Sequence, residues 1–395
     1  MRTTTKFRFL VLILLVTISG FTQGMLLPLI AVILEQNQVS SSINGLHATG
    51  LYIGVLIASP FMEKPLRKIG YKPMIAFGGA IVFTSLFFFP LWDALWFWFI
   101  LRVTIGIGDQ MLHFGTQTWI TSTSPEEKRG RNIALYGLFF GAGFALGPIM
   151  TRLVSVHIAL PFVISALFSV VVWSLLFWIR NEIPEEEEEY STSSNSFKRF
   201  AKALQYAWVA FLPPFGYGFL EATLHGNFPV YALRIGHDVN TLSYIIPTFA
   251  AGSLLSQLPL GILSDKIGRK KVLVFVILAG IVCFYTASFY EHSVLWLIIL
   301  FILAGVFVGS IFSLGISYMT DILPKSLLPA GNIMCGIAFS IGSIIGPYLG
   351  GVYIDWFPQA SFFHVITSML IIILIPILLT QQPRPASSRH LASSN

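Results

Sequence analysis

Apolar runs of about twenty residues recur along almost the whole chain, separated by short polar breaks. A helix of that length spans the hydrocarbon core of a bilayer, which is about 30 Å thick. Since backbone groups in lipid must bond internally, the sequence predicts an all-α integral membrane protein. We expect about twelve transmembrane helices, at residues 9–33, 43–62, 73–90, 95–121, 132–155, 158–179, 204–232, 242–263, 272–290, 294–319, 331–354 and 360–380.

The composition agrees with this class. Of 395 residues, 55% are hydrophobic and 11% are charged, which lies outside the range of soluble domains. The first run follows basic residues but no small-residue cleavage site follows it, so we expect an uncleaved first helix. The two cysteines, Cys283 and Cys335, form neither a disulfide framework nor a metal-binding spacing. No metal site is predicted.

The distribution of basic residues predicts how the chain is oriented in the membrane. With the N-terminus in the cytoplasm, 21 of the 24 Lys and Arg residues fall in cytoplasmic loops and tails. This bias is the positive-inside pattern, so we expect both termini in the cytoplasm. It accounts for the net charge of +6 and leaves no basic patch for nucleic acid. Short loops are typical of a multi-pass protein of a bacterial plasma membrane, and we expect a monomer whose partners are the bilayer and a small-molecule substrate.

A charged, serine-rich stretch at 181–202 divides the chain and reads as a cytoplasmic linker. Its acidic run, Glu185 to Glu189, is expected to be a solvated loop. We therefore expect one six-helix bundle at 1–180, a second at 203–380 and a cytoplasmic tail at 381–395.

The two bundles repeat one design. With a shift of 199 residues, seven Gly, Thr and Pro positions of the first half coincide with the same residue types in the second, without a gap. With a shift of 198, "KIGYK" (68–72) meets "KIGRK" (266–270). Two repeats of six helices keep the same orientation, so an axis along the membrane normal relates them. That arrangement places a cavity between the halves.

The loop "GILSDKIGRKK" (261–271) resembles the cytoplasmic loop signature of the major facilitator superfamily, the large family of twelve-helix secondary transporters. In that family the loop latches the two halves in one of their alternating states. Its first-half counterpart departs from the pattern, with Glu63 in place of the glycine and Arg67 in place of the aspartate, so that latch is expected to be weakened or altered. The resemblance assigns a conformational role to Gly261, Asp265, Gly268, Arg269 and Lys270. By spacing, Gly261 would let two helices approach and the basic residues would lie at lipid headgroups.

Two helices carry further resemblances. "RVTIGIG" (102–108) is similar to the fourth-helix signature of the family's proton-coupled drug antiporters, with Ile105 where glutamine is common. "GLFFGAGFALGP" (137–148) is similar to the fifth-helix antiporter signature but lacks its final glycine pair. Small residues at this spacing also pack helices generally. We expect helix packing at Gly143, Gly147, Pro148, Gly342, Gly346 and Pro347.

Polar residues interrupt two of the apolar runs. At 100° per residue, Arg102, Asp109 and His113 share one helix face, and an arginine there costs about 2.5–3.5 kcal/mol on insertion scales. Glu221 and His225 are four residues apart and also face one way. Gln23 and Asn227 add uncharged polar groups that could line a cavity. Family geometry implies that helices one, four, seven and ten surround the central cavity.

Two interpretations of this polar set stay open. In one, Asp109 and Glu221 exchange protons while Arg102 tunes them, and an ion pair between Arg102 and Glu221 across the halves is geometrically possible. In the other, the groups form a static, satisfied network that fixes helix packing.

The leading expectation is a secondary transporter that works by alternating access, coupling a proton gradient to the export of amphipathic or lipophilic small molecules. The first alternative is a proton or sodium symporter for a sugar or small metabolite, and sodium coupling stays open. A non-transporting membrane sensor or scaffold is the alternative from another class. We do not expect an enzyme or a cofactor, because the sequence has no H-E-x-x-H, G-x-S-x-G or P-loop motif.

Overall fold

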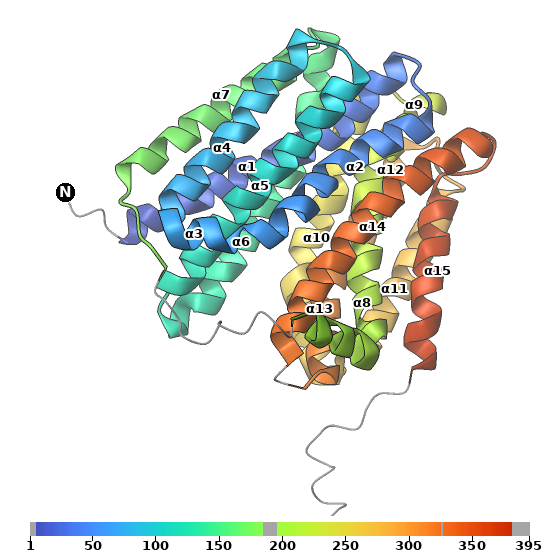
Figure 1. Cartoon of the computed structure of the whole chain (residues 1–395). Coiled ribbons are helices and arrows are strands. Elements are labelled where there is room, and N and C mark those ends of the chain that lie inside the picture. Colours follow the sequence, from blue (N-terminus) through green and yellow to red (C-terminus); the bar gives the residue numbers. More distant parts are fainter. Residues whose placement is uncertain (1–4, 185–195, 325–326, 381–395) are drawn as a thin grey trace, which may run out of the picture.

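The computed structural model describes residues 5–184, 196–324 and 327–380 (Figure 1). The acidic run 185–189, most of the expected linker and the tail 381–395 lie outside the described residues. Within the described ranges every regular element is a helix. The protein is therefore all-α.

The first half contains seven α-helices with short 3₁₀ segments between them. They are α1 (Thr5–Gln36), α2 (Ser41–Ala58), η1 (Ser59–Phe61), α3 (Glu63–Ile69), α4 (Tyr71–Phe88), η2 (Phe89–Leu91), α5 (Leu95–Thr123), α6 (Glu126–Leu146), η3 (Gly147–Ser155), α7 (Leu160–Ser174) and η4 (Leu175–Trp178). Proline at the first or second residue of η1, η2 and η3 explains why helices give way to 3₁₀ turns there.

The second half contains eight α-helices. They are α8 (Ser196–Gly226), α9 (Phe228–Arg234), α10 (Val239–Ile267), α11 (Arg269–Ala287), α12 (Val294–Val308), α13 (Ile311–Ile322), α14 (Leu328–Trp356) and α15 (Phe363–Leu379). Because α8 begins at Ser196, residues 196–202 of the expected linker are helical. The helix kinks at Ala207, whose backbone leaves helical geometry shortly before Pro213 and Pro214.

Each of the twelve expected spans coincides with one helix or with consecutive helices. Among the described residues, nine helical stretches are long and apolar enough to cross a bilayer, or ten if the pair bent by 60° around Met62 is one span. The span expected at 294–319 is broken: α12 ends at Val308 and α13 begins at Ile311. Glycine followed by serine at 309–310 allows that break.

Glycines set the distance between α1 and α6. A Cβ added at Gly143 of α6 would overlap the carbonyl oxygen of Thr17 on α1. In the second half, a Cβ at Gly342 of α14 would overlap the carbonyl oxygen of Phe215 on α8 in the same way. Such contacts are how membrane helices approach closely. The four glycines expected to pack helices all lie at these contacts: Gly143, Gly147, Gly342 and Gly346.

A second helix pair repeats between the halves. Gly106 of α5 lies against the carbonyl oxygen of Leu51 on α2, and Gly305 of α12 lies against that of Phe249 on α10. The turn glycines also correspond, because Gly70 and Gly268 both have positive φ, at 86° and 101°. The pseudo-symmetric repeat is therefore confirmed at the level of backbone contacts.

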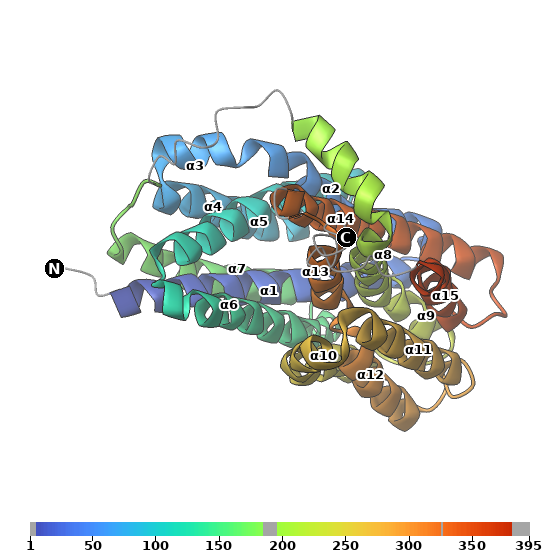
Figure 2. The same cartoon turned by 90° about the horizontal axis from the view of Figure 1, so that it is seen from below.

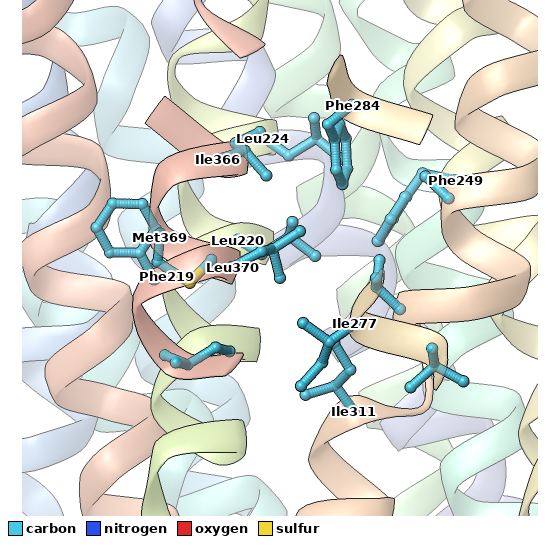
Figure 3. Packing of buried hydrophobic residues seen from close by; sticks show 14 of the residues in the cluster. Phe219, Leu220, Leu224, Phe249, Ile277, Phe284, Ile311, Ile366, Met369 and Leu370 are labelled. Carbon is cyan, nitrogen blue, oxygen red and sulfur yellow. The ribbon is translucent and has the colours of Figure 1, made fainter. Parts of the chain in front are cut away.

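Apolar packing fills each half separately. In the second half, side chains from all eight described helices meet in one buried cluster. Figure 3 labels some of its members: Phe219, Leu220 and Leu224 of α8, Phe249 of α10, Ile277 and Phe284 of α11, Ile311 of α13, and Ile366, Met369 and Leu370 of α15. Two further clusters lie mainly among the first-half helices. Each half is thus held together largely by its own core.

The halves meet along two helix pairs. Helix α2 packs against α14, while α6 and η3 pack against α10. Figure 2 shows the first-half helices on the left and the second-half helices on the right, with α2 and α14 at the boundary. We call the end of the bundle that holds Thr5, Gly70 and Gly268 the N-terminal face, and the opposite end the far face.

On the far face, polar contacts join the two halves. Asp355 of α14 accepts hydrogen bonds from the backbone N–H groups of Ser41 and Ser42 at 3.0 and 2.8 Å, and from the Ser42 hydroxyl at 2.7 Å. Arg234 of α9 pairs with Glu35 of α1 at 2.8 Å and with Asp355 at 3.5 Å. We call these five residues the far-face clasp. They hold the far face closed.

Toward the N-terminal face the halves part (Figure 1). The ion pair and side-chain hydrogen bonds seen between described residues of the two halves lie in the clasp. Leu255 and Leu258, on the part of α10 toward the N-terminal face, are each 73% exposed. The structure is closed at the far face and open at the N-terminal face.

The glycine contacts yield a matched test on α6. Gly143→Ala should lower the free energy of unfolding by about 1–3 kcal/mol relative to Gly137→Ala, because only at Gly143 does the added methyl meet a backbone oxygen. Both changes gain the same helix propensity, and a Cβ at Gly137 meets nothing within 4 Å. Thermal unfolding in detergent measures the difference. Equal stability of the two variants would contradict the close contact.

The clasp yields a test of closure. Arg234→Gln should open the far face more often, raising the rate at which maleimide labels Ala48→Cys by about 5-fold, equivalent to about 1 kcal/mol. Ala48 is 1% exposed and packs beside Gly226 of the other half, so it is labelled only when the far face opens. Arg67→Gln removes an ion pair within one half and should leave the rate unchanged. Equal rates in all three backgrounds would show that the clasp does not hold the face closed.

Candidate functional site

Asp109 lies at the centre of the first half, fully buried on α5. Its Oδ1 accepts a hydrogen bond of 2.7 Å from the hydroxyl of Ser19 on α1, and its Oδ2 has no partner. His113, one turn along α5, places Nε2 at 3.0 Å from the same hydroxyl and at 3.4 Å from the Gln23 amide nitrogen. The expected polar face of this helix therefore points into the bundle, against α1. It does not face lipid.

His113 also contacts α6. Its Nδ1 lies 2.5 Å from the hydroxyl of Tyr136, and its ring packs edge-on against Phe140 at 5.0 Å. Ser19 and Tyr136 are site residues that the sequence did not reveal, because a lone serine or tyrosine in an apolar run is common and carries no spacing signal. Three helices, α1, α5 and α6, thus share one hydrogen-bonded cluster.

Arg102 lies two turns from Asp109 on α5 and is 1% exposed. Its Nη2 donates to the carbonyl oxygen of Leu26 at 3.3 Å, while Nε and Nη1 have no partner. Gly50 of α2 gives room for the arginine, because a Cβ there would lie 3.2 Å from Arg102 Cβ. A guanidinium buried with two unmatched nitrogens is energetically costly, which is typical of a group whose partner changes.

Glu221 lies on α8, in the second half, and is partly exposed. The expected ion pair between Arg102 and Glu221 is absent from the structure as described, and Glu221 makes none of its ion pairs. Equal depth along two helices does not fix how the side chains rotate, which explains why the pair is not formed. Tyr52 of α2 is an electrostatic neighbour of both Arg102 and Glu221. Tyr217 is a further neighbour of Glu221.

Aromatic rings from both halves gather near Glu221. Phe339 of α14 lies 6.4 Å from Tyr52, 6.2 Å from Tyr217 and 5.4 Å from Phe312, measured between ring centroids. Tyr52 belongs to the first half and the other three to the second. We call Tyr52, Tyr217, Phe312 and Phe339 the aromatic group. Among 35 Phe in the chain, nothing in the sequence distinguishes the two phenylalanines.

His225 and Asn227 lie toward the far face. His225 Nδ1 bonds to the backbone carbonyl of Glu221 at 2.8 Å, and its ring packs 4.8 Å from Phe144 of the other half. Asn227 occupies the break between α8 and α9, and neither amide atom has a partner. Other buried polar atoms without a partner there include Asn44 Oδ1, His47 Nδ1 and Thr223 Oγ1. Buried polar atoms without a partner thus belong to both halves near the far face, alongside the hydrogen bonds of the clasp.

The proline positions differ from one another. Pro148 lies where α6 gives way to η3. Pro347 lies inside α14, where its carbonyl oxygen meets Gly45 of α2 across the boundary between the halves. The first therefore changes helix geometry, and the second lies at a contact that must separate if the far face opens.

The loop at 261–271 forms its contacts within the second half. Arg269 donates to Asp321 at 2.9 Å and to the carbonyl oxygen of Ser317 at 2.6 Å, and pairs with Asp265 at 3.3 Å. Lys270 bonds to the carbonyl oxygen of Leu378, at 3.3 Å, instead of reaching outward. A Cβ at Gly261 would meet nothing within 4 Å, so the expected close helix approach there is absent. The halves are apart at this face, which explains the open space.

The first-half loop is held differently. Arg67 pairs with Glu63 at 2.8 Å, one turn away on α3. The turn at Gly70 instead packs on Asn181, which accepts from the Lys72 backbone N–H at 3.0 Å. The departures at Glu63 and Arg67 thus pair with each other. They leave no acidic residue at the position of Asp265.

Among the residues described, no group of three or more His, Cys, Asp or Glu could hold a metal ion. The chemistry available is therefore that of two carboxylates, one in each half, with an unmatched arginine beside the boundary. Proton exchange and the binding of a cation are the reactions these groups can perform.

Comparison with known proteins supports a family assignment. The family model for the Major Facilitator Superfamily matches residues 12–243 and 211–394. An uncharacterized MFS-type transporter of Bacillus subtilis strain 168, YfkF, is 55% identical over 365 residues, covering 92% of this chain and 93% of that protein. The uncharacterized MFS-type transporter YcaD of Escherichia coli O45:K1 is 23% identical over 384 residues, covering 96% of each.

Solved structures show the same fold. The nucleoside transporter NupG has a TM-score of 0.77 at 14% identity, covering 94% of this chain and 98% of that one. A bacterial homolog of the human lysosomal transporter Spinster, in an inward-facing and unoccupied conformation, has a TM-score of 0.71 at 16% identity, covering 95% and 96%. With the two repeats, the paired glycines and the site between the halves, these matches show that the chain belongs to the major facilitator superfamily of membrane transporters.

Proposed function

We propose that this transporter exports amphipathic, cationic compounds across the bacterial plasma membrane in exchange for protons. It works as a monomer, with the N-terminal face and both termini in the cytoplasm, as the distribution of basic residues favours. The observation that carries the proposal is Glu221, a partly exposed carboxylate without an ion-pair partner in the described chain, set beside the aromatic group. A cation stacks favourably on aromatic faces, and a carboxylate completes such a site.

The carboxylates of Asp109 and Glu221 have different roles in the proposed cycle. Asp109 is fully buried in the first half and exchanges protons, while Glu221 exchanges its proton for the cationic substrate. Arg102, with two unmatched nitrogens, tunes both groups by moving between them as the halves rearrange. This division explains why the two acids lie in different halves. Their relative position changes in each cycle.

The unmatched polar atoms favour exchange over a static network. Each buried polar atom without a hydrogen-bond partner costs about 1–3 kcal/mol, and a group that changes partners during a transport cycle would account for such atoms. Here Asp109 Oδ2, two Arg102 nitrogens and both amide atoms of Asn227 lack partners. Water reaching these atoms in an outward-open state would offset part of the cost of separating the far face, so the two states come close in free energy.

Proteoliposomes with an imposed pH gradient and trapped pyranine test the proposal. Tetraphenylphosphonium should elicit proton movement by the native protein, and Asp109→Asn or Glu221→Gln should reduce that flux at least 10-fold. Glu63→Gln, which alters an exposed acid paired with Arg67, should keep the native flux.

Adding uridine, a sugar or sodium in the same assay distinguishes cation export from the alternative transport functions. Proton movement with uridine or a sugar but not with tetraphenylphosphonium would contradict cation export and favour symport of a polar metabolite. Flux that depends on sodium and not on protons would contradict proton coupling. Native flux in both carboxylate variants would show that the acids are structural.

A further inference from the structure

Asp109 needs a path to water if it exchanges protons, because it is fully buried. A cavity of about 10 Å³ lies against it, which is room for one water at most. The rest of the lining of that cavity is mainly apolar, with residues such as Leu15, Val82 and Leu112. The hydrogen-bonded side chains next to Asp109 offer its proton a route that does not depend on this cavity.

The bonded groups form one continuous chain. Asp109 Oδ1 lies 2.7 Å from Ser19 Oγ, which lies 3.0 Å from His113 Nε2. His113 Nδ1 lies 2.5 Å from Tyr136 Oη. Each link is within hydrogen-bond distance. Both ring nitrogens of His113 are therefore engaged, one toward the acid and the other toward α6.

The polarity of the chain is consistent along its length. With Asp109 ionised, Ser19 donates its hydroxyl proton to the carboxylate and can accept from His113 Nε2–H. In that tautomer the Gln23 amide nitrogen, 3.4 Å from Nε2, does not bond to it. His113 is then neutral with Nδ1 as acceptor, and Tyr136 donates to it. Every proton points toward Asp109. That is the arrangement left after a proton has moved out along the chain.

Tyr136 ends the chain near the N-terminal face. It is partly exposed, and Asn132, one turn earlier on α6, lines a cavity of about 300 Å³. The same cavity is lined by Lys6, Ser124 and Lys128 near the ends of their helices. Tyr136 thus lies one helical turn from a residue that lines this cavity.

We propose that Ser19, His113 and Tyr136 form a proton relay between Asp109 and the N-terminal face. In the release step the Asp109 proton moves to Ser19, the Ser19 proton to His113 Nε2, the Nδ1 proton to Tyr136 and the Tyr136 proton to water. One proton leaves Asp109 and one reaches water, so the step balances and each relay group stays neutral. The relay deepens the proposed function, on which its physiological role rests.

Other titratable groups do not offer a second path. The residues of α1, α4 and α7 that line the small cavity at Asp109 are Leu15, Ile18, Ser19, Thr22, Gly79, Val82, Ser169 and Trp173, none of which titrates in the physiological range. From α5 the nearest titratable group is His113, one turn away, and from α6 it is Tyr136, an electrostatic neighbour of Asp109. Arg102 lies two turns along α5 in the opposite direction.

Infrared spectroscopy after a rapid pH jump tests the relay on the purified full-length protein without any substrate. The carboxyl band that disappears in Asp109→Asn identifies Asp109. Tyr136→Phe should slow the change of that band at least 10-fold while leaving its final amplitude unchanged. His113→Gln should slow it as well. The control is Tyr318→Phe in the second half. It removes a buried tyrosine hydroxyl that has no hydrogen-bond partner, so it should keep the native rate.

The outcomes separate the two proposals. Native rates in both Tyr136→Phe and His113→Gln, with native thermal unfolding, would overturn the relay whatever the transport assay shows. Slowed rates in these variants, with no proton flux for any compound in proteoliposomes, would support the relay and contradict the proposed export. If the Asp109 band never changes between acidic and alkaline buffer, Asp109 exchanges no proton and both proposals fail.

Discussion

The cost of burying charge away from water is the constraint on which the rest of this structure depends. Asp109 and Arg102 lie on one helix in the core of the first half, and neither has the partners that would satisfy it fully. Such groups persist in membrane helices when they face protein or a cavity and when function needs them. The neighbouring helices give these groups a serine, a histidine, a glutamine and one backbone carbonyl. They give no opposite charge, so the charge of the acid stays responsive to what happens around it.

Rigid halves make that responsiveness useful. Glycine contacts hold α1 against α6 and α2 against α5. In the second half the corresponding contacts hold α8 against α14 and α10 against α12. Each half can therefore move as a unit, and the contacts between halves are fewer and more polar. The far-face clasp and the unmatched atoms around Asn227 lie where movement must occur. Because each half is tightly packed, a change at the site is expected to move one half against the other at the boundary between them, without deforming either half.

Much of this arrangement could be predicted from sequence, because it depends on periodicity. Run lengths gave the helices, the 198- and 199-residue shifts gave the repeat, and 100° spacing placed Asp109 and His113 on one face. An ion pair between Arg102 and Glu221, which equal depth made geometrically possible, is not formed in this structure, because depth along two helices does not fix side-chain rotation across a boundary. Ser19, Tyr136 and the clasp residues were missed because each is a single polar residue whose partner lies far away in sequence.

The central claim is that Asp109 exchanges a proton and that this exchange is coupled to the movement of the two halves. Double electron–electron resonance, which measures the distance between two spin labels, tests it most directly in a protein with Cys283 and Cys335 replaced by alanine. One pair of labels replaces Phe61 and Leu258 near the N-terminal face, and a second pair replaces Trp92 and Trp356 at the far face. These four side chains are 53–75% exposed. In Asp109→Asn, which fixes a neutral side chain, the account predicts that both distances differ from those of the native protein at alkaline pH, and that they change in opposite directions. Distances identical to those of the native protein at alkaline pH would contradict it.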